Sequence, residues 1–229
     1  MSDNKKYIIL DIDATLVHTH GEIEKYKLLE IFSDSDKIKY RKKLYSMKLY
    51  DVSGDPGLGN ITVLSGIYRP YLKEFLDFCF IYFDKVIIWS AGRKKYVEKM
   101  CQIMFPLEDQ PDDILTYNDC DLSRGVDNLK KPISKVFKRH PEMNYKNTFI
   151  VDDRDDTFSL NSENGIQIPE YESDLSVEDI TSHPDDNLLK LIAWFSSKKI
   201  MNCKDIRKLD KSDIFKKSLE EYKKEMKKK

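Results

Sequence analysis

The sequence predicts an α/β protein in which a parallel β-sheet is flanked by helices, with short insertions and no large cap domain. Three apolar runs, at residues 7–10, 85–92 and 148–151, lack the polar alternation of half-exposed strands. Such runs are typical of strands buried on both faces of a parallel sheet. Helix-like segments alternate with them, at residues 71–83 and 94–104. The resulting β-α-β-α order favours parallel neighbours joined by right-handed crossovers.

The predicted elements follow one another along the chain. After the first strand, the charged segment 21–60 is expected to be an insertion, with helical character near residues 37–49. A strand is expected at 61–64, and Pro70 stands where the first turn of a helix tolerates proline. The remaining elements are helix 71–83, strand 85–92, helix 94–104, short strands near 114–117 and 126–129 within a second insertion at 106–130, helix 132–137, strands 148–151 and 165–168, and helix 186–197.

Length and charge divide the chain into one domain and a basic tail. A chain of 229 residues, 40% of them hydrophobic, fits a single α/β domain with appendages. The net charge of -1 conceals an asymmetry, because residues 198–229 carry 13 Lys and Arg against 6 Asp and Glu. The tail is therefore +7 and the rest of the chain is -8. We predict a domain over residues 1–199, including both insertions, and a basic helical tail over 200–229.

The tail has two interpretations. Residues 204–229 contain an irregular apolar stripe, which favours a helix packed on its own domain. Alternatively, the basic end at 223–229 binds nucleic acid or an acidic partner, or acts as a nuclear localisation signal.

Cysteine usage and hydropathy point to a soluble intracellular protein, nuclear or cytoplasmic. Cys79, Cys101, Cys120 and Cys203 show no CxxC spacing and no paired framework, which favours reduced thiols. The first predicted strand begins by residue 7, which leaves no room for a leader peptide, and no apolar run approaches 18 residues. We therefore expect no contact with a membrane.

Two carboxylates, Asp11 and Asp13, follow the first predicted strand directly. In an extended segment they point to the same side while Ile12 points away, so both can reach one ligand. Ligands of α/β proteins collect where parallel strands end. An Asp-x-Asp at a strand end can also simply begin a turn, and this pair alone does not decide between the two.

Further polar groups follow the other predicted strands. Ser90 ends the second apolar run, Asp152 and Asp153 end the third, and Lys131 lies beside a helix start between them. If the strands are parallel neighbours, all these groups meet at one edge of the sheet. Carboxylates without His or Cys suit Mg²⁺, and a lysine with a hydroxyl suits an anion. Phosphoryl transfer needs this combination of charge neutralisation and positioning.

The segment from Asp11 to Val17 resembles the DxDxT(L/V) signature of haloacid-dehalogenase-type phosphatases. The resemblance is to the FCP/SCP, NLI-interacting-factor-like branch, which dephosphorylates the C-terminal domain (CTD) of RNA polymerase II. Members with a ubiquitin-like domain are the most similar, although that domain is absent from this sequence. The similarity spans roughly residues 7–197 and includes four further motifs: Tyr68-Arg69-Pro70, Trp89-Ser90-Ala91 with Lys94 to Met100, Lys131-Pro132-Ile133, and Asp152-Asp153 with Asn164-Gly165-Ile166.

The resemblance implies a role for each acid. Asp11 is the expected nucleophile, which forms an aspartyl-phosphate. Asp13 is the expected proton carrier, first as acid and then as base. Mg²⁺ is expected to bind the carboxylates of Asp11 and Asp152, the backbone carbonyl of Asp13, and Asp153 through water.

The same resemblance assigns the remaining site residues. Ser90 is expected to bind a phosphoryl oxygen, Lys131 to supply positive charge and Thr15 to fix the nucleophile loop. Many relatives carry a lysine where this chain has Cys120, so the role passes to the Lys-Pro pattern at Lys131, with Lys130 as the alternative. Ser90 has a second interpretation as a helix cap.

Other charged residues near these motifs are open to two interpretations. Arg69 either touches substrate or pairs with a carboxylate. Arg154, Asp155 and Asp156 are expected in a solvated turn, and His18 and His20 have no required role. Tyr68, Tyr117 and Phe158 are candidate aromatic contacts.

The expected substrate is a phosphoserine or phosphothreonine in a flexible protein tail or loop, since the short insertions leave the site open. The RNA polymerase II tail and a link to the transcription machinery follow from the resemblance alone. A polynucleotide 3'-phosphatase, or another phosphatase of small esters, is one alternative, although the acidic body of the chain argues against nucleic acid. The other alternative is a non-catalytic binding module on the same fold, like the mitochondrial import receptor of this family.

Overall fold

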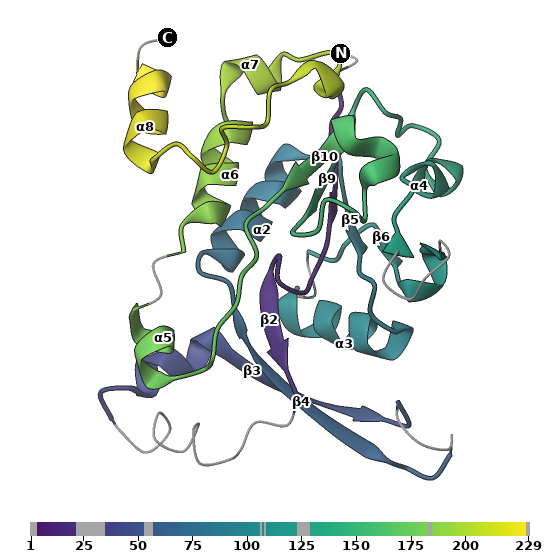
Figure 1. Ribbon diagram of the computed structural model, residues 1–229, viewed down its shortest axis with the longest axis vertical. Coiled ribbons are helices and arrows are strands. Elements are labelled where there is room, and N and C mark those ends of the chain that lie inside the picture. Colours follow the sequence, from purple (N-terminus) through teal and green to yellow (C-terminus); the bar gives the residue numbers. More distant parts are fainter. Residues whose placement is uncertain are drawn as a thin grey trace.

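A five-stranded parallel sheet forms the centre of the computed structural model, which describes residues 4–21, 35–52, 57–105, 107, 109–122, 129–182 and 185–227 (Figure 1). The strand order is β10-β9-β1-β5-β6, with β1 in the middle. This confirms the predicted fold class. The strands are β1 (Tyr7–Leu10), β5 (Lys85–Trp89), β6 (Asp113–Leu115), β9 (Thr148–Asp152) and β10 (Gly165–Gln167).

Side chains of successive residues in the sheet point into two separate cores. Ile8 and Leu10 of β1 belong to a large cluster that includes residues of helices α2 (Leu72–Tyr82), α3 (Lys94–Met104) and α6 (Asn187–Phe195). Tyr7 and Ile9 belong to a second cluster, which includes Val136 of α4 (Ser134–Arg139). Because the side chains of a strand alternate between its faces, both faces of the sheet are covered.

A second, antiparallel sheet replaces the helix expected at 37–49. Only a 3₁₀ helix, η1 (Ile38–Lys43), forms there, and β3 (Leu44–Tyr50) pairs with β4 (Ile61–Tyr68), which pairs in turn with β2 (Val17–His20). The helical prediction was wrong because β3 has a period of two, with Tyr45, Met47 and Leu49 buried and the residues between them exposed. Figure 1 shows β3 and β4 projecting away from the main sheet, beyond α3.

The second insertion contains only short elements. Between β6 and α4 lie η2 (Tyr117–Asp119), β7 (Asp121–Leu122) and β8 (Leu129–Lys130), and β7 and β8 pair with each other. Most of the strand expected near 126–129 lies outside the described residues.

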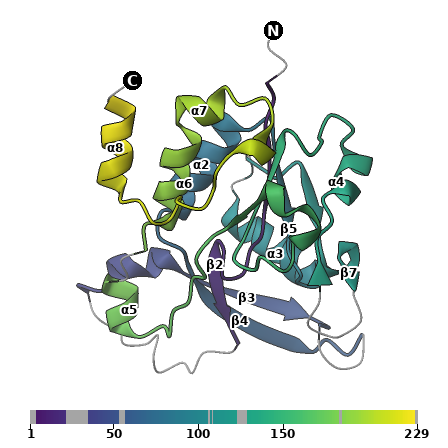
Figure 2. The ribbon, with the colours of Figure 1, turned by 45° about the horizontal axis from the view of Figure 1, so that its top comes forward.

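The C-terminal region departs from the single helix expected over 204–229. It contains α7 (Lys198–Met201), η4 (Ile206–Lys208) and α8 (Leu219–Lys227), with α8 beside α6 (Figure 2). Asp205 and Asp210 accept backbone N–H groups two residues further on, and such local bonds compete with a helix. The buried residues Ile206, Leu209, Ile214 and Tyr222 join the large core cluster. The domain boundary at residue 199 stays a prediction.

Hydrogen bonds of Lys211 link this region to the domain. Its ammonium donates to the backbone carbonyls of Glu163 at 2.7 Å and Ile206 at 3.0 Å. Tyr222 donates its hydroxyl to the carbonyl of Ile214 at 2.9 Å. The described part of this region therefore packs on the domain, although not as the single helix of the first interpretation.

Helices η3 (Ser159–Asn164), which directly precedes β10, and α5 (Val177–Ser182), which contacts η1, complete the described elements. Among the described residues, no helix combines the length and apolar character that crossing a bilayer requires.

A buried ion pair joins the residue that follows β4 to the start of α6. The side chain of Arg69 is fully buried and lies 2.8 Å from Asp185. Its other nitrogens donate to the carbonyls of Thr15 at 2.9 Å and Pro169 at 2.7 Å. This pairing is one of the two roles expected for Arg69. Burial alone would raise the pKa of Asp185, but the hydrogen bond and charge of Arg69 outweigh it and lower that pKa.

Asp185→Asn leaves the buried guanidinium of Arg69 without a counter-ion, so we expect it to lower the free energy of unfolding by about 3 kcal/mol at neutral pH. The measurement is urea unfolding followed by circular dichroism. Because the folded-state pKa of Asp185 lies below its unfolded value of about 4, this difference is complete above pH 4 and shrinks as the pH falls through the folded pKa.

Asp77→Asn provides the control, since the Lys73–Asp77 pair on α2 is largely exposed. We expect its effect on the free energy of unfolding to be much smaller than that of Asp185→Asn, because solvent screens an exposed pair. Equal effects of the two substitutions would contradict a structural role for the buried pair.

Candidate active site

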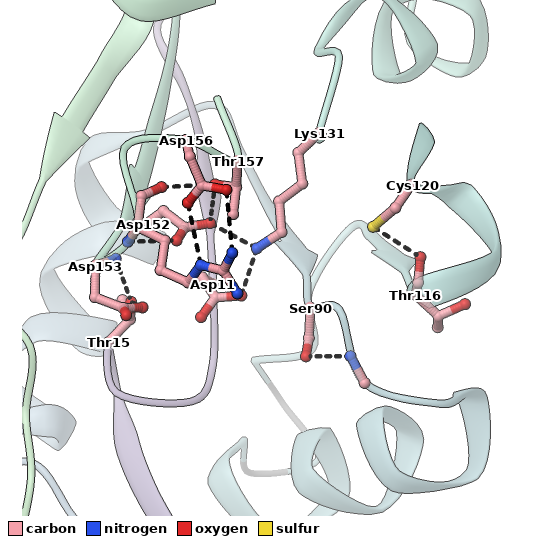
Figure 3. Close-up of polar contacts among 12 residues, drawn as sticks. Asp11, Thr15, Ser90, Thr116, Cys120, Lys131, Asp152, Asp153, Asp156 and Thr157 are labelled. Atoms are coloured by element: carbon pink, nitrogen blue, oxygen red, sulfur yellow. Dashed lines mark hydrogen bonds and ion pairs between the residues drawn. The ribbon is translucent and has the colours of Figure 1, made fainter. Parts of the chain in front are cut away.

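The polar groups that follow the central strands meet at one edge of the sheet (Figure 3). Leu10 of β1 is in register with Ile88 of β5 and with Val151 of β9. Asp11 therefore follows its strand at the same level at which Asp152 ends its own. The strand-end convergence expected from the sequence brings Asp11, Ser90 and Asp152 to this edge.

Lys131 lies between two of these acids. Its ammonium is 2.5 Å from Asp11 Oδ1 and 2.6 Å from Asp152 Oδ2, and the lysine side chain is 1% exposed. Its backbone N–H donates to the carbonyl of Thr157 at 2.6 Å. Lys130 instead donates to the backbone carbonyl of Asp156. The structure thus places Lys131, not Lys130, beside the predicted nucleophile.

Burial and charge act against each other in this cluster. Burial raises the pKa of Asp11, although Lys131 opposes the shift. Burial also disfavours the charged form of Lys131, but attraction to Asp11 and Asp152 prevails and raises its pKa above the ordinary lysine value. The ammonium of Lys131 is therefore charged, because it contacts both carboxylates at hydrogen-bond distance.

Asp11, Asp152 and Asp153 form a group able to hold a metal ion. One carboxylate oxygen from each lies within 4.8 Å of the others. Burial, followed by the charge of Asp152, raises the pKa of Asp153, and a cation at this point would relieve that repulsion. A set of carboxylate oxygens without His or Cys fits Mg²⁺. Asp13 contributes no carboxylate to this group, so the structure leaves only its backbone carbonyl as a candidate ligand.

Thr15 connects the loop after β1 to the loop after β9. Its hydroxyl donates to Asp153 Oδ1 at 3.1 Å and accepts the N–H of Asp153 at 3.1 Å. Thr157 supports Asp152 in a similar way, donating to Oδ2 at 2.8 Å. The acidic loop is therefore held on both sides by buried hydroxyls.

The loop after β1 is a tight turn with an unusual backbone. Leu16 and Val17 both donate to the carbonyl of Ile12. Ala14 has φ of 58°, a left-handed conformation that costs a residue with a Cβ about 1 kcal/mol. The carbonyl of Ala14 accepts the N–H of Tyr171 at 2.8 Å. External bonds thus hold this strained turn between the two acids and β2.

The carboxylate of Asp13 lies in different surroundings from that of Asp11. Its Oδ1 accepts the hydroxyl of Thr19 at 2.7 Å and also the hydroxyl of Tyr96. No cation contacts it in the described part of the chain. Burial, followed by the charge of Asp13, raises the pKa of Tyr96, so its hydroxyl remains a proton donor.

Ser90 is 2% exposed and its Oγ accepts the N–H of Gly92 at 3.0 Å (Figure 3). The helix that follows has Arg93 at its N-cap, without a side-chain cap. Ser90 is therefore not the cap of α3. Its hydroxyl hydrogen remains available to a ligand at the end of β5.

Other candidates occupy ordinary structural positions. Arg154 pairs with Asp156 on an exposed turn, as expected. Cys120 is buried, and burial raises its thiol pKa. His20 bonds the carbonyl of Ser173. Phe158 is buried in the core, Tyr68 is partly buried against the core, and Tyr117 is 39% exposed.

Sequence reasoning missed Thr19, Tyr96 and Thr157 as residues of the site. Tyr96 falls within a quoted motif, but a helical position gives no sign that its hydroxyl reaches the loop after β1. Thr19 had one available signal, because alternation in a strand starting at Val17 places Thr19 on the same face as Val17 and opposite His18.

A groove of about 560 Å³ lies next to these residues. Leu49, Val52, Thr62 and Leu64 line it from the antiparallel sheet side, and Gly92, Arg93 and Tyr96 line it from α3 and the residues just before that helix. Tyr96 thus belongs to the groove and also contacts Asp13.

Comparison with known proteins adds independent evidence. The model of one family, described as NLI interacting factor-like phosphatase, matches residues 6–207. A ubiquitin-like domain-containing CTD phosphatase 1 of Danio rerio is 31% identical over 112 residues, which cover 44% of this chain and 34% of that protein. The corresponding protein of Drosophila melanogaster is 27% identical over 109 residues, covering 44% and 33%. The chain thus spans about a third of the length of these relatives.

Two solved structures share the fold. The structure of Fcp1, an RNA polymerase II CTD phosphatase, has a TM-score of 0.58 at 20% identity, over 87% of this chain and 52% of that one. Fission yeast Fcp1 bound to beryllium fluoride has a TM-score of 0.56 at 22% identity, over 74% and 43%.

A CTD phosphatase-like protein of Invertebrate iridescent virus 6 is 28% identical over 157 residues, covering 65% of this chain and 76% of that protein.

Magnesium should raise the melting temperature of the protein, because it offsets repulsion among Asp11, Asp152 and Asp153. At ten times its Kd, a ligand stabilises by about 1.4 kcal/mol, or roughly 3–5 °C for a chain of this size. We expect Asp152→Asn to abolish this shift, as measured by differential scanning calorimetry with and without MgCl₂.

Asp156→Asn is the matched control, since Asp156 lies in the same loop but pairs with Arg154 outside the metal-binding group. It should keep the full magnesium shift. An equal shift in Asp152→Asn would rule out this group as the metal site.

Proposed function

Because the chain belongs to the family of NLI interacting factor-like phosphatases, we propose that it hydrolyses phosphoserine or phosphothreonine esters in a flexible protein segment, with Mg²⁺ and an aspartyl-phosphate intermediate. One observation carries the proposal. Asp11 and Asp152 end neighbouring parallel strands, and the buried ammonium of Lys131 lies between them. This geometry supports roles for Asp11 as nucleophile, Asp152 as metal ligand and Lys131 as the positive charge.

In the first step, a carboxylate oxygen of Asp11 attacks phosphorus opposite the leaving oxygen. The Asp11–phosphorus bond forms as the phosphorus–oxygen bond to serine or threonine breaks. Asp13 gives its proton to the departing oxygen and becomes a carboxylate. Bound Mg²⁺ would neutralise charge on the phosphoryl group, held by Asp11, Asp152 and Asp153.

Lys131 and Ser90 stabilise the transferring group. Lys131 has its charge at Asp11 before substrate arrives, so it faces the phosphoryl oxygens without reorganisation. The Ser90 hydroxyl, already oriented by Gly92, donates to a phosphoryl oxygen.

In the second step, Asp13 accepts a proton from water as the water attacks phosphorus. The bond to Asp11 breaks, inorganic phosphate leaves, and both acids return to their starting states. Asp13 suits both steps because hydroxyl groups, not a lysine, surround its carboxyl group.

The groove between the antiparallel sheet and α3 favours an extended substrate. A loop or tail can lie along Leu49, Leu64 and Tyr96 and present its phosphate to Asp11. Relatives are CTD phosphatases by name, so a repeat of the RNA polymerase II tail is the first peptide to try. The transcription machinery and a nuclear location follow as parts of the same proposal.

Asp11→Asn should lower kcat for p-nitrophenyl phosphate by more than about 1,000-fold, because it removes the nucleophile. Phosphate release with MgCl₂ is the measurement, and Asp213→Asn, an exposed site on the C-terminal region, should keep full activity. Phosphorylated substrate should transfer a phosphoryl group to the wild-type protein, and hydroxylamine, which cleaves acyl phosphates, should remove it. Asp11→Asn should not acquire this group. Retained turnover in Asp11→Asn would exclude this nucleophile.

The same assay tests the substrate class. A phosphoserine peptide should be hydrolysed with higher kcat/KM than a 3'-phosphorylated oligonucleotide. The reverse order would favour a polynucleotide phosphatase, and phosphate release from none of the three substrates would favour a binding module.

Asp13→Asn should affect substrates according to their leaving groups. A phosphoserine peptide releases a strongly basic alkoxide, so kcat/KM should fall by about 100- to 10,000-fold when the acid is lost. 2,4-Dinitrophenyl phosphate releases a weak base that needs no proton, so its kcat/KM should change far less. Equal losses on both substrates would contradict the acid role.

A further inference from the structure

Three hydroxyl groups form a network around the carboxylate of Asp13. Thr19 Oγ1 lies 2.7 Å from Asp13 Oδ1, 2.7 Å from the hydroxyl of Tyr45 and 2.6 Å from that of Tyr96. Tyr96 also donates directly to Asp13 Oδ1. The members come from β2, β3 and α3, which are distant in the sequence.

We infer that Tyr96, together with Thr19, is a positioning residue that holds Asp13 Oδ1 and so assigns the transferable proton to Oδ2. The inference rests on the proposed function and deepens it, since it names what orients the proton carrier.

The hydrogens of the network can be placed by counting donors. Each hydroxyl has one hydrogen, and a carboxylate oxygen only accepts. If Thr19 and Tyr96 both donate to Oδ1, then Thr19 can accept from Tyr45. The three hydrogens fill three of the four contacts, and the contact between Thr19 and Tyr96 has none of its own. Two donors on Oδ1 disfavour a proton on that oxygen. The proton that leaves with the substrate oxygen therefore resides on Oδ2.

The fold provides room for this arrangement. Gly66 of β4 lies in register with Tyr45 of β3 and Thr19 of β2. A Cβ at Gly66 would collide with the ring and hydroxyl of Tyr45. Glycine at this position therefore allows the Tyr45 hydroxyl to reach Thr19.

The position of Asp13 thus depends on the antiparallel sheet and α3, not on the parallel sheet alone. A general acid must be held close to its productive geometry, and small misplacements of catalytic groups cost large factors in rate. Tyr96 supplies that constraint from the wall of the groove.

Tyr96→Phe is the test, because it removes the hydroxyl and keeps the ring that lines the groove. The parameter is kcat/KM, which reports the steps up to departure of the leaving group. We expect a fall of about 10- to 100-fold on a phosphoserine peptide and of less than about 3-fold on 2,4-dinitrophenyl phosphate. Equal losses on both substrates, or none on the peptide, would overturn the inference.

Tyr82→Phe is the matched control. Tyr82 is a partly buried tyrosine of α2, and its hydroxyl has no hydrogen-bond partner among the described residues. Removing that hydroxyl should leave kcat/KM unchanged on both substrates.

Substitutions at Thr19 test the second donor. Thr19→Ser keeps the hydroxyl and should retain wild-type selectivity between the substrates, whereas Thr19→Val should lose it in part. The double variant Tyr96→Phe/Thr19→Val should approach Asp13→Asn on the peptide. A double variant no worse than Tyr96→Phe would overturn the role of Thr19.

A crystal structure of the double variant separates this inference from the proposed function. If the wild-type protein hydrolyses neither substrate, the proposed function fails. The position of the Asp13 carboxyl group in the double variant, compared with the wild type, still tests the inference. We expect its carboxyl group to rotate away from its wild-type place. A carboxyl group within about 0.5 Å of that place would show that the hydroxyls do not position it.

Discussion

The buried guanidinium of Arg69 holds together segments that otherwise share no strand pairing. It donates to the carbonyl of Thr15 in the loop after β1, to that of Pro169 after β10, and to Asp185 at the start of α6. The strained turn at Ala14 persists because such bonds fix its carbonyls. Thr15 is then in place to bind Asp153. The spacing between the two acidic loops thus depends on a cation that lies outside the group of Asp11, Asp152 and Asp153.

The two acids of the DxD motif differ because their neighbours differ. Asp11 faces an ammonium and another carboxylate, surroundings that suit an ionised nucleophile and a divalent cation. Asp13 faces neutral hydroxyl donors, surroundings in which a carboxyl group can hold or release a proton without breaking an ion pair. The two acids are two residues apart in the sequence but contact different parts of the fold. Asp11 lies at the edge of the parallel sheet, whereas Asp13 contacts residues of β2 and α3.

Sequence patterns predicted the parallel sheet and the meeting of Asp11, Ser90 and Asp152, because buried runs mark strands and parallel strands end at one edge. They did not decide whether Lys130 or Lys131 lies in the site. The two residues are adjacent, so only the directions of their side chains in the folded chain separate them. The helix expected at 37–49 was wrong because short polar-apolar segments fit more than one period. That error hid Tyr45, and with it the network around Asp13, which depends on side-chain directions across β2, β3 and α3. The single helix expected from residue 204 ignored the local bonds of Asp205 and Asp210.

The chain contains two tryptophans, and their positions make one of them a built-in optical reporter. Trp89 is fully buried at the end of β5, directly before Ser90. Trp194 of α6 packs in the cluster on the opposite face of the sheet. With Trp194 replaced by phenylalanine, the tryptophan emission would come from a single indole next to the sheet edge that carries Asp11 and Asp152. Ligand arrival could then be followed by emission in stopped-flow experiments without any attached dye.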